Sequence, residues 1–289
     1  MANLKEVRTR IASVSSTQQI TSAMKMVSAA KFRRAQNAII GMRPYAAQLN
    51  EIIADIDTGD GVQTPYHAVR PLQTVVLVVV TSNKGLCGAF NSNVLKLAQQ
   101  RIDHYRKEQV AIRVVSIGKK ASELLVRQKD LQLASHDELL DAPTFDAIAS
   151  LADNLMDDFA EKRIDRVELV YNQFKNSLSQ VLSCEQWLPI DTRNSRGSKE
   201  SVNNDYIYEP SKEEILREMI PLTLRSTFYR MVLDSLAAEH GARMTAMQKA
   251  TDNATELLKD LRLSYNKARQ ASITNEIIEI VSGSEALKG

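Results

Sequence analysis

The two ends of the chain contain almost none of the residues that interrupt helices. Residues 1–40 hold neither glycine nor proline, and no proline follows Pro221. Helix-breaking residues gather instead in the middle of the chain, between Gly59 and Gly197. Because long segments without these residues favour uninterrupted helices, the sequence predicts one helix over Leu4–Ile56 and another over Leu222–Val281.

The length of these two helices limits the fold. At a rise of about 1.5 Å per residue, the first helix would extend about 80 Å and the second about 90 Å. A compact globule of 289 residues would be only about 50 Å across. Both helices must therefore protrude from the domain in which they are rooted, and the simplest arrangement is an antiparallel coiled coil.

A coiled coil needs small or apolar side chains at alternating steps of four and three residues. In the last helix this step visits Ala250, Ala254, Leu257, Leu261, Ser264, Ala268 and Ala271. In the first helix it visits Leu4, Val7, Ile11 and Val14, and then meets the polar Gln18 and Thr21 before Met24 and Val27. Such small side chains let the backbones approach closely but bury little area, so we expect the pair to be weakly held.

The last helix is the longer of the two, so its end should extend beyond the first helix. That end is apolar and carries Ile273, Ile277, Ile278, Ile280 and Val281. Exposed apolar patches of this kind usually mark an interface with another molecule.

Between the two helices, the sequence alternates strand and helix patterns. Residues Thr74–Thr81 are apolar and mostly β-branched, as expected for a strand covered on both faces. Further strands are predicted over Ala111–Ile117, Leu131–Ala134, Arg166–Tyr171 and Leu178–Leu188, and helices over Asn93–Lys107, Lys119–Gln128 and Phe145–Lys162. Strands joined by helices indicate a mostly parallel, doubly wound, Rossmann-like α/β sheet of about five strands.

These patterns divide the chain into four parts. Residues 1–57 form the N-terminal coiled-coil helix, 72–190 the central α/β domain, 191–210 an exposed loop and 211–289 the C-terminal coiled-coil helix. Charge follows the same division, because residues 1–43 hold 8 lysines and arginines against a single acidic residue, on a chain whose net charge is +2. This basic helix either faces an acidic partner or is simply a solvated helix face.

No catalytic or metal-binding pattern emerges. The four histidines are scattered, and Cys87 and Cys184 are too few for a disulfide framework or a thiolate metal site. The segment Ser82–Asn91 follows a strand, as phosphate-binding loops do, but it lacks their glycine and lysine spacing, so a packing turn with a buried Cys87 is favoured. The longest apolar run, Val75–Val80, is too short to span a bilayer, and no secretory leader opens the chain.

Two classes of protein are compatible with these observations. A nucleotide-dependent enzyme with helical arms is compatible with the strand–turn–helix order. A nucleic-acid-binding coiled coil is compatible with the basic first helix. Composition and motifs together lead us to expect an intracellular protein without a cofactor or a structural metal.

The chain closely resembles the gamma subunits of F-type ATP synthases over its full length. The resemblance is carried by the first-helix run from Thr17 to Lys31, by the turn Gly85–Gly88 and by two last-helix runs, Ala250–Ala254 and Tyr265–Thr274. The chain departs from the family at Asn83-Lys84, usually Asp-Arg, and at Gly283-Ser284, usually Gly-Ala. The cysteine pair of the chloroplast branch is missing from Asp191–Asp205, which favours a bacterial form without thiol control.

This resemblance implies a non-catalytic central rotor shaft that couples proton flow through a membrane rotor to ATP synthesis or hydrolysis. The implied partners are the alpha and beta subunits of the catalytic ring, the epsilon subunit and the c-subunit rotor ring, with the shaft at the cytoplasmic side of the inner membrane. It further implies that beta-subunit loops contact Arg269, Gln270, Thr274, Met24 and Arg243. The rotor ring and epsilon subunit would meet Tyr206, Tyr208 and Glu209, and the apolar tip would turn in a low-polarity sleeve.

Overall fold

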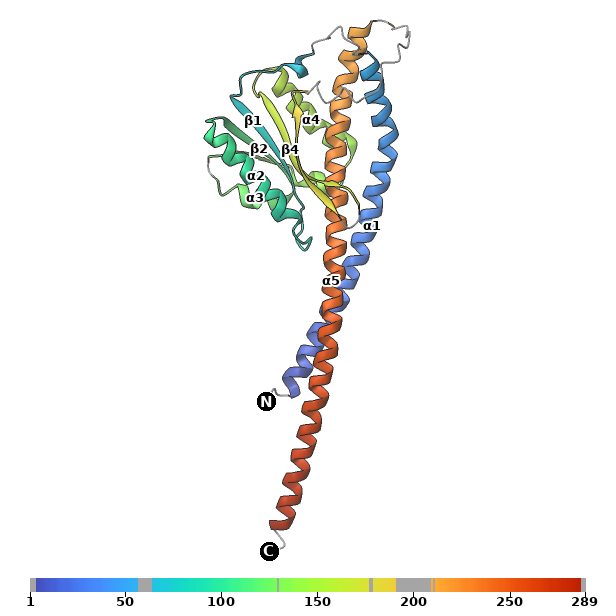
Figure 1. The fold of residues 1–289 in the computed structure, drawn as a ribbon, viewed down its shortest axis with the longest axis vertical. Helices are drawn as coiled ribbons and strands as arrows, with labels where there is room; N and C mark the ends of the chain where they lie inside the picture. Colours follow the sequence, from blue (N-terminus) through green and yellow to red (C-terminus); the bar gives the residue numbers. More distant parts are fainter. Residues whose placement is uncertain are drawn as a thin grey trace. The chain divides into compact units, whose positions relative to one another are not determined.

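The structure, a computed structural model, describes residues 4–56, 64–128, 130–176, 179–190, 209 and 211–286. The chain forms two compact units, one of residues 1–28 with 244–289 and the other of residues 29–243. Helices α1 (Leu4–Ile56) and α5 (Lys212–Ala286) each contribute residues to both units (Figure 1). The two predicted terminal helices are thus confirmed, with α1 at the predicted bounds.

Helix α5 begins earlier than the sequence predicts, because it runs through Pro221 instead of starting after it. An internal proline costs a helix about 3 kcal/mol, since it removes a backbone hydrogen bond. Here the apolar side chains on both sides of the proline, Leu216, Ile220 and Leu224, are buried in the core and offset that cost. The Ser211 hydroxyl accepts a hydrogen bond from the Glu214 backbone amide at 3.2 Å and so caps the helix start.

The second unit contains a five-stranded sheet. The strands are β1 (Thr74–Val80), β2 (Ala111–Ile117), β3 (Gln132–Ser135), β4 (Arg166–Phe174) and β5 (Gln180–Leu188). Their order is β3-β2-β1-β4-β5, and all neighbours are parallel except β4 and β5. The short connection from Phe174 to Gln180 explains the exception, because a parallel crossover needs a dozen or more residues. The predicted mostly parallel sheet is confirmed.

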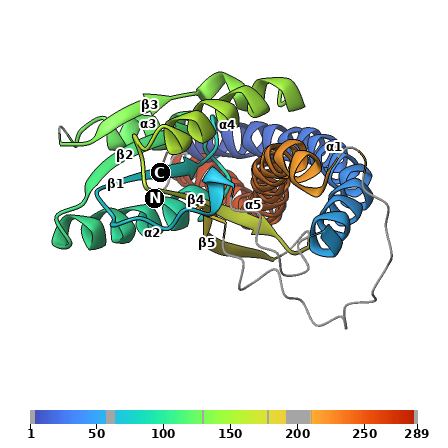
Figure 2. The ribbon, with the colours of Figure 1, turned by 90° about the horizontal axis from the view of Figure 1, so that it is seen from above.

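The central strand β1 has both faces covered by helices. Helix α2 (Phe90–Lys107) lies on one side of the sheet and α4 (Phe145–Ala160) on the other (Figure 2). Helix α3 (Lys119–Leu125) packs with α2, while short 3₁₀ turns η1 (Pro65–His67) and η2 (Asp137–Leu140) flank the strands. Alternate β1 side chains therefore enter two different cores, with Val75, Leu77 and Val79 on the α2 side and Val76, Val78 and Val80 on the α4 side.

The long helices complete the α4-side core. Helix α5 contributes Leu216, Ile220, Leu224, Phe228, Met231 and Val232 to it. The Trp187 ring on β5 packs 5.0 Å from the Phe228 ring and donates its Nε1 hydrogen to the Leu224 carbonyl at 3.2 Å. Helix α1 adds Ala35 and Ile39, which pack on α5 at Leu233, Leu236 and Ala237. The range 72–190 thus holds the whole sheet and α4, but not the long helix α5 that also covers this face.

Gly118 joins β2 to α3 where no side chain fits. Its φ is +108°, and a Cβ added there would lie 2.3 Å from the Thr81 carbonyl oxygen. We expect Gly118→Ala to lower the free energy of unfolding by about 2–4 kcal/mol, from steric overlap and backbone strain. Urea denaturation would measure the loss. Gly41→Ala is the matched control, because its Cβ meets no atom within 4 Å and it lies in α1, where alanine is favoured. Equal stability of the two variants would contradict the strain at Gly118.

Candidate functional site

The first unit is an antiparallel pair formed by the start of α1 and the second half of α5. The Gln18 side-chain amide donates to the Thr255 hydroxyl at 2.7 Å, and the Thr251 hydroxyl donates to the Thr21 hydroxyl at 2.8 Å. From Gln18 to Thr21 the residue numbers rise along α1, while those of their partners fall from Thr255 to Thr251 along α5, so the two helices are antiparallel. The predicted coiled coil is thereby confirmed, and polar as well as apolar side chains meet in its seam.

From Leu257 onward, the seam of α5 differs from the predicted one at every second position, while the predicted Ala250 is half-buried. The buried and half-buried residues from Thr251 to Ser272 are Thr251, Ala254, Leu258, Leu261, Tyr265, Ala268 and Ser272, while the predicted Leu257 is 39% exposed. Both patterns step by four and three and share Ala254, Leu261 and Ala268. Hydrophobicity alone could not separate Leu257 from Leu258. The packing of α5 against α1 decides between them, because it buries Leu258 and leaves Leu257 exposed.

The seam of α1 is confirmed as far as Met24 and differs at Val27. Val7, Thr21 and Ser28 are buried, whereas the predicted Val27 is 59% exposed. After Thr21 the alternating steps lead to Lys25 and Ser28, so helix geometry places a polar residue in the seam and a valine on the surface. The small Ser28 hydroxyl is satisfied within the helix by the Met24 carbonyl, at 2.7 Å.

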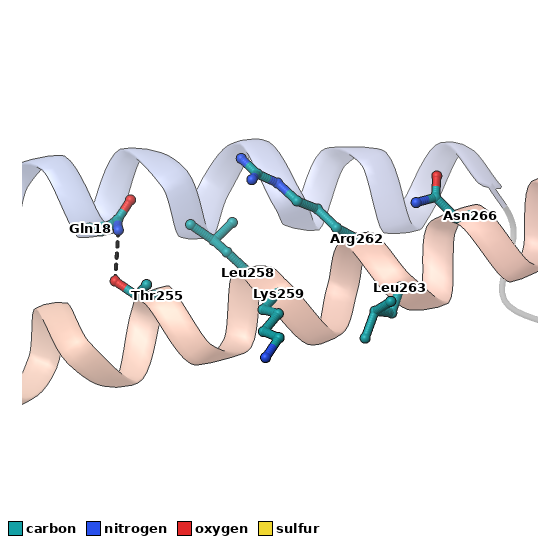
Figure 3. A pocket seen from close by; sticks show the side chains of 7 residues that line it. All are labelled: Gln18, Thr255, Leu258, Lys259, Arg262, Leu263 and Asn266. Carbon is teal, nitrogen blue, oxygen red and sulfur yellow. Dashed lines mark hydrogen bonds between the residues drawn. The ribbon is translucent and has the colours of Figure 1, made fainter.

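A hollow of about 340 Å³ opens beside this seam. It is lined by Gln18, Thr255, Leu258, Lys259, Arg262, Leu263 and Asn266 (Figure 3). Arg262 is directed toward α1 and Lys259 away from it. The lining holds no acid, cysteine or histidine, so its residues suit contact with another molecule better than bond-breaking chemistry.

The end of α5 extends beyond the start of α1 within this unit (Figure 1). Continuing the register from the Gln18–Thr255 pair places Leu4, where α1 begins, level with Arg269. Past that point the apolar side chains are uncovered, from Ile273 at 47% exposure to Ile280 at 72%. Ile277, Ile278 and Val281 are also exposed. No described residue of this chain covers the tip, as the sequence predicts.

Three predicted contact residues lie together where the overhang begins. Arg269, Gln270 and Thr274 are exposed on α5, and the Thr274 hydroxyl donates to the Gln270 carbonyl at 2.9 Å. Met24 is half-buried on α1. Glu209 is exposed, and Tyr206 and Tyr208 lie outside the described residues.

Arg243 lies elsewhere, inside the second unit. Only 7% of its surface is exposed, and its guanidinium pairs with Glu239 and with backbone carbonyls of the turn after β1. This position differs from the exposed one that contact with another subunit would require. Sequence reasoning missed the burial because nothing local indicates that a turn more than 150 residues away covers the side chain.

Burial also shifts the titration of the neighbours of Arg243. Desolvation raises the pKa of the Glu239 carboxyl, although Arg243 and Lys31 oppose the shift. Burial lowers the pKa of His240 to about 4, and the positive charges of Arg243 and Lys31 act in the same direction. His240 is therefore neutral near pH 7.

A second buried charge, Glu168 on β4, was also missed. Its carboxylate is 4% exposed and accepts hydrogen bonds from Arg101 at 2.6–3.0 Å and from the Tyr105 hydroxyl at 2.5 Å. The signal available in the sequence was a glutamate between the apolar residues Val167 and Leu169. The Cys184 thiol donates to the same carboxylate at 3.5 Å, and burial raises the pKa of that thiol to about 12. Cys184 thus stays protonated, and the cluster joins α2 to the sheet without a nucleophile.

The turn Ser82–Asn91 packs as predicted. Cys87 is 1% exposed, and the Asn91 side-chain oxygen accepts a hydrogen bond from the Ser82 amide at 3.0 Å. Among the described residues, no group of His, Cys, Asp or Glu side chains could hold a metal ion. No helix in the described ranges is both long and apolar enough to cross a membrane.

Comparison with known proteins identifies close relatives. A family model described as ATP synthase matches residues 3–287. The chain is 53% identical over 291 residues to the ATP synthase gamma chain of Flavobacterium johnsoniae, and the match covers 100% of both chains. It is 42% identical over 290 residues to the ATP synthase gamma chain of Geobacter sp. strain M21, again with 100% of both covered.

Solved structures show the same fold. The central stalk and c-ring structure of Tetrahymena thermophila mitochondrial ATP synthase matches with a TM-score of 0.58 and 26% identity, over 80% of this chain and 99% of that chain. An OSCP/F1/c-ring structure of the Euglena gracilis enzyme matches with a TM-score of 0.70 and 21% identity, over 98% and 94%. These likenesses confirm the predicted resemblance and give no support to a nucleic-acid-binding coiled coil.

The buried neutral His240 predicts acid sensitivity of the fold. An unfolded chain takes up a proton at His near pH 6.5, whereas folded His240 does so near pH 4. In this window the unfolded state binds more protons, so stability falls as the pH is lowered. Between pH 7 and pH 4.5, we expect the free energy of unfolding of the His240→Gln variant to fall by roughly 2 kcal/mol less than that of the unchanged chain. Urea denaturation at both pH values measures the difference, and equal losses would contradict the prediction.

Proposed function

This chain belongs to the ATP synthase family of gamma chains, and on that premise we propose that it is the non-catalytic central shaft of a rotary ATP synthase. Turning of the shaft would carry each catalytic site of a surrounding alpha–beta ring through its binding states. The observation that carries this proposal is the antiparallel pair of α1 and α5 with an uncovered apolar tip. A rotating axle needs such a tip, because a low-polarity sleeve can hold apolar side chains without directional bonds.

The ring-facing surface would combine charge and hydrogen bonding. Residues 1–43 carry a large excess of positive charge, which suits acidic loops of beta subunits. Arg269, Gln270 and Thr274 are exposed where the overhang begins and would contact a beta-subunit loop in some rotary positions only. By the register of the Gln18–Thr255 pair, Met24 lies level with Lys249, so it would contact a different part of the ring. Charge-assisted bonds that form and break on each turn shape the barriers between rotary positions more than the net binding.

The opposite end of the shaft would meet the membrane sector. We assign this contact to the c-subunit ring and the epsilon subunit, through Tyr206, Tyr208 and the exposed Glu209. The protein would then be a peripheral subunit at the cytoplasmic side of the inner membrane that couples hydrogen ion transport to ATP synthesis. In this role it needs no cofactor of its own.

Arg269 separates coupling from assembly. We expect Arg269→Ala to leave the complex assembled but to lower ATP turnover, by about tenfold for each 1.4 kcal/mol added to the limiting barrier. Turnover is measured on the purified complex. Lys267→Ala is the matched control, because it removes an exposed positive charge two residues away. Unchanged synthesis and hydrolysis in Arg269→Ala would refute the assigned contact.

Deletion of Ile273–Gly289 tests the tip and the partners together. A tagged full-length chain should co-purify with alpha and beta subunits, and its truncated form should yield a complex that dissociates at lower temperature. The isolated chain should unfold at nearly the same urea concentration with or without the deletion, because its described tip residues are exposed. Absence of alpha and beta subunits from the full-length preparation would contradict the proposed function.

A further inference from the structure

Two kinds of contact hold α5 to the sheet domain within the second unit. From Leu216 to Val232 the contact is apolar and merges with the α4-side core. Further along, at Glu239 and Arg243, it is polar. Apolar packing is non-directional, whereas hydrogen bonds have a preferred direction, so the polar contact can fix the orientation of α5.

The polar contact uses three nitrogens of one guanidinium. Arg243 Nη2 donates to the Lys84 carbonyl at 2.7 Å, and Nε donates to the Gly85 carbonyl at 3.2 Å. The third nitrogen, Nη1, donates to Glu239 Oε1 at 2.6 Å, one helical turn back along α5. Arg243 is 7% and Glu239 6% exposed, so water does not compete strongly for these bonds. We call these four residues the Arg243 contact.

The turn that receives Arg243 also has a shape and a hydrogen bond of its own. Leu86 and Gly88 both have φ of +61°, which curls the backbone. The Ser82 hydroxyl donates to the Lys84 carbonyl at 2.7 Å and holds that oxygen in place. Beside the contact, Cys87 and Phe90 pack on Ala238 of α5. A shaped polar acceptor therefore lies next to an apolar support.

We propose that Arg243, oriented by Glu239, is a positioning residue that fixes the rotational setting of α5 against the sheet domain, so that torque on the domain passes into the helix. Rotating a helix by one residue turns a side chain by about 100°, which would swing the guanidinium away from both carbonyls. Planar, charge-assisted bonds enforce that setting near the turn, whereas the adjoining apolar contact of α5, through the small Ala238, would tolerate slippage. This inference depends on the proposed function, because torque is meaningful only for a shaft.

The test uses the full chain, alone and in its complex. Arg243→Gln alone leaves the Glu239 carboxylate buried without a partner and could prevent folding, so Arg243→Gln/Glu239→Gln is made as well. Arg243→Lys keeps the positive charge beside Glu239 but lacks the planar fork. Tyr229→Phe is the matched control, because it removes one other hydrogen bond from α5 to the same domain, to the Pro143 carbonyl at 3.3 Å.

The first measurement is hydrogen exchange of residues 82–90 in the isolated chain. We expect exchange roughly tenfold or more faster in the double variant, partial recovery of protection in Arg243→Lys and no change in Tyr229→Phe. The second is the number of protons pumped per ATP hydrolysed by the complex in membrane vesicles. That ratio should fall about twofold or more in the double variant, while the rate of ATP hydrolysis by the same variant changes less. In Tyr229→Phe the ratio should also change less.

The outcomes separate the two proposals. If the unchanged chain forms no proton-pumping complex, the proposed shaft function is wrong. If that complex pumps normally but the double variant keeps both its exchange protection and its pumping ratio, the inference about Arg243 is overturned. Faster exchange with an unchanged ratio also overturns it, because the contact would then be structural without carrying torque.

Discussion

The packing of α5 on one face of the sheet is the interaction on which the rest of the structure depends. Leu224 and Phe228 are buried against β5 and α4, and the Trp187 side chain contacts both of their helical turns. Burying a large apolar side chain contributes about 1.5–3 kcal/mol, and α5 buries six in this core. Without this contact, the part of this face that α4 leaves uncovered would be exposed, and α1 would lose the surface on which it packs.

The two units are stabilised by different means. In the second, large apolar side chains fill two cores on either side of β1, with α2 on one side and α4 and α5 on the other. In the first, residues such as Ala254 and Thr21 meet in a seam that buries little area, and hydroxyl and amide groups pair across it. Weak pairing of this kind gains stability from a surrounding partner by mass action. A shaft that works inside a ring can therefore be only modestly stable by itself.

Two buried charges in this protein join elements of the fold. Glu168 connects β4 to Arg101 and Tyr105 of α2, and Arg243 connects α5 to the turn after β1. Each charge is paired and hydrogen-bonded, which is the condition for keeping it in a low-dielectric interior. Such bonds specify orientation, whereas the apolar cores supply most of the free energy of folding.

The sequence by itself determined the elements and their class. The β-branched run at β1, the alternation of strands with helices and the glycine- and proline-poor ends predicted a mostly parallel sheet with two long antiparallel helices. Each of these features lies within one segment of the chain, so the corresponding helix or strand can be predicted from that segment alone. Tertiary structure alone decided that Leu258 rather than Leu257 enters the seam, that α5 continues through Pro221 and that Arg243 is buried. Each of these depends on a segment distant in sequence, whose packing compensates a local cost or selects between equivalent patterns.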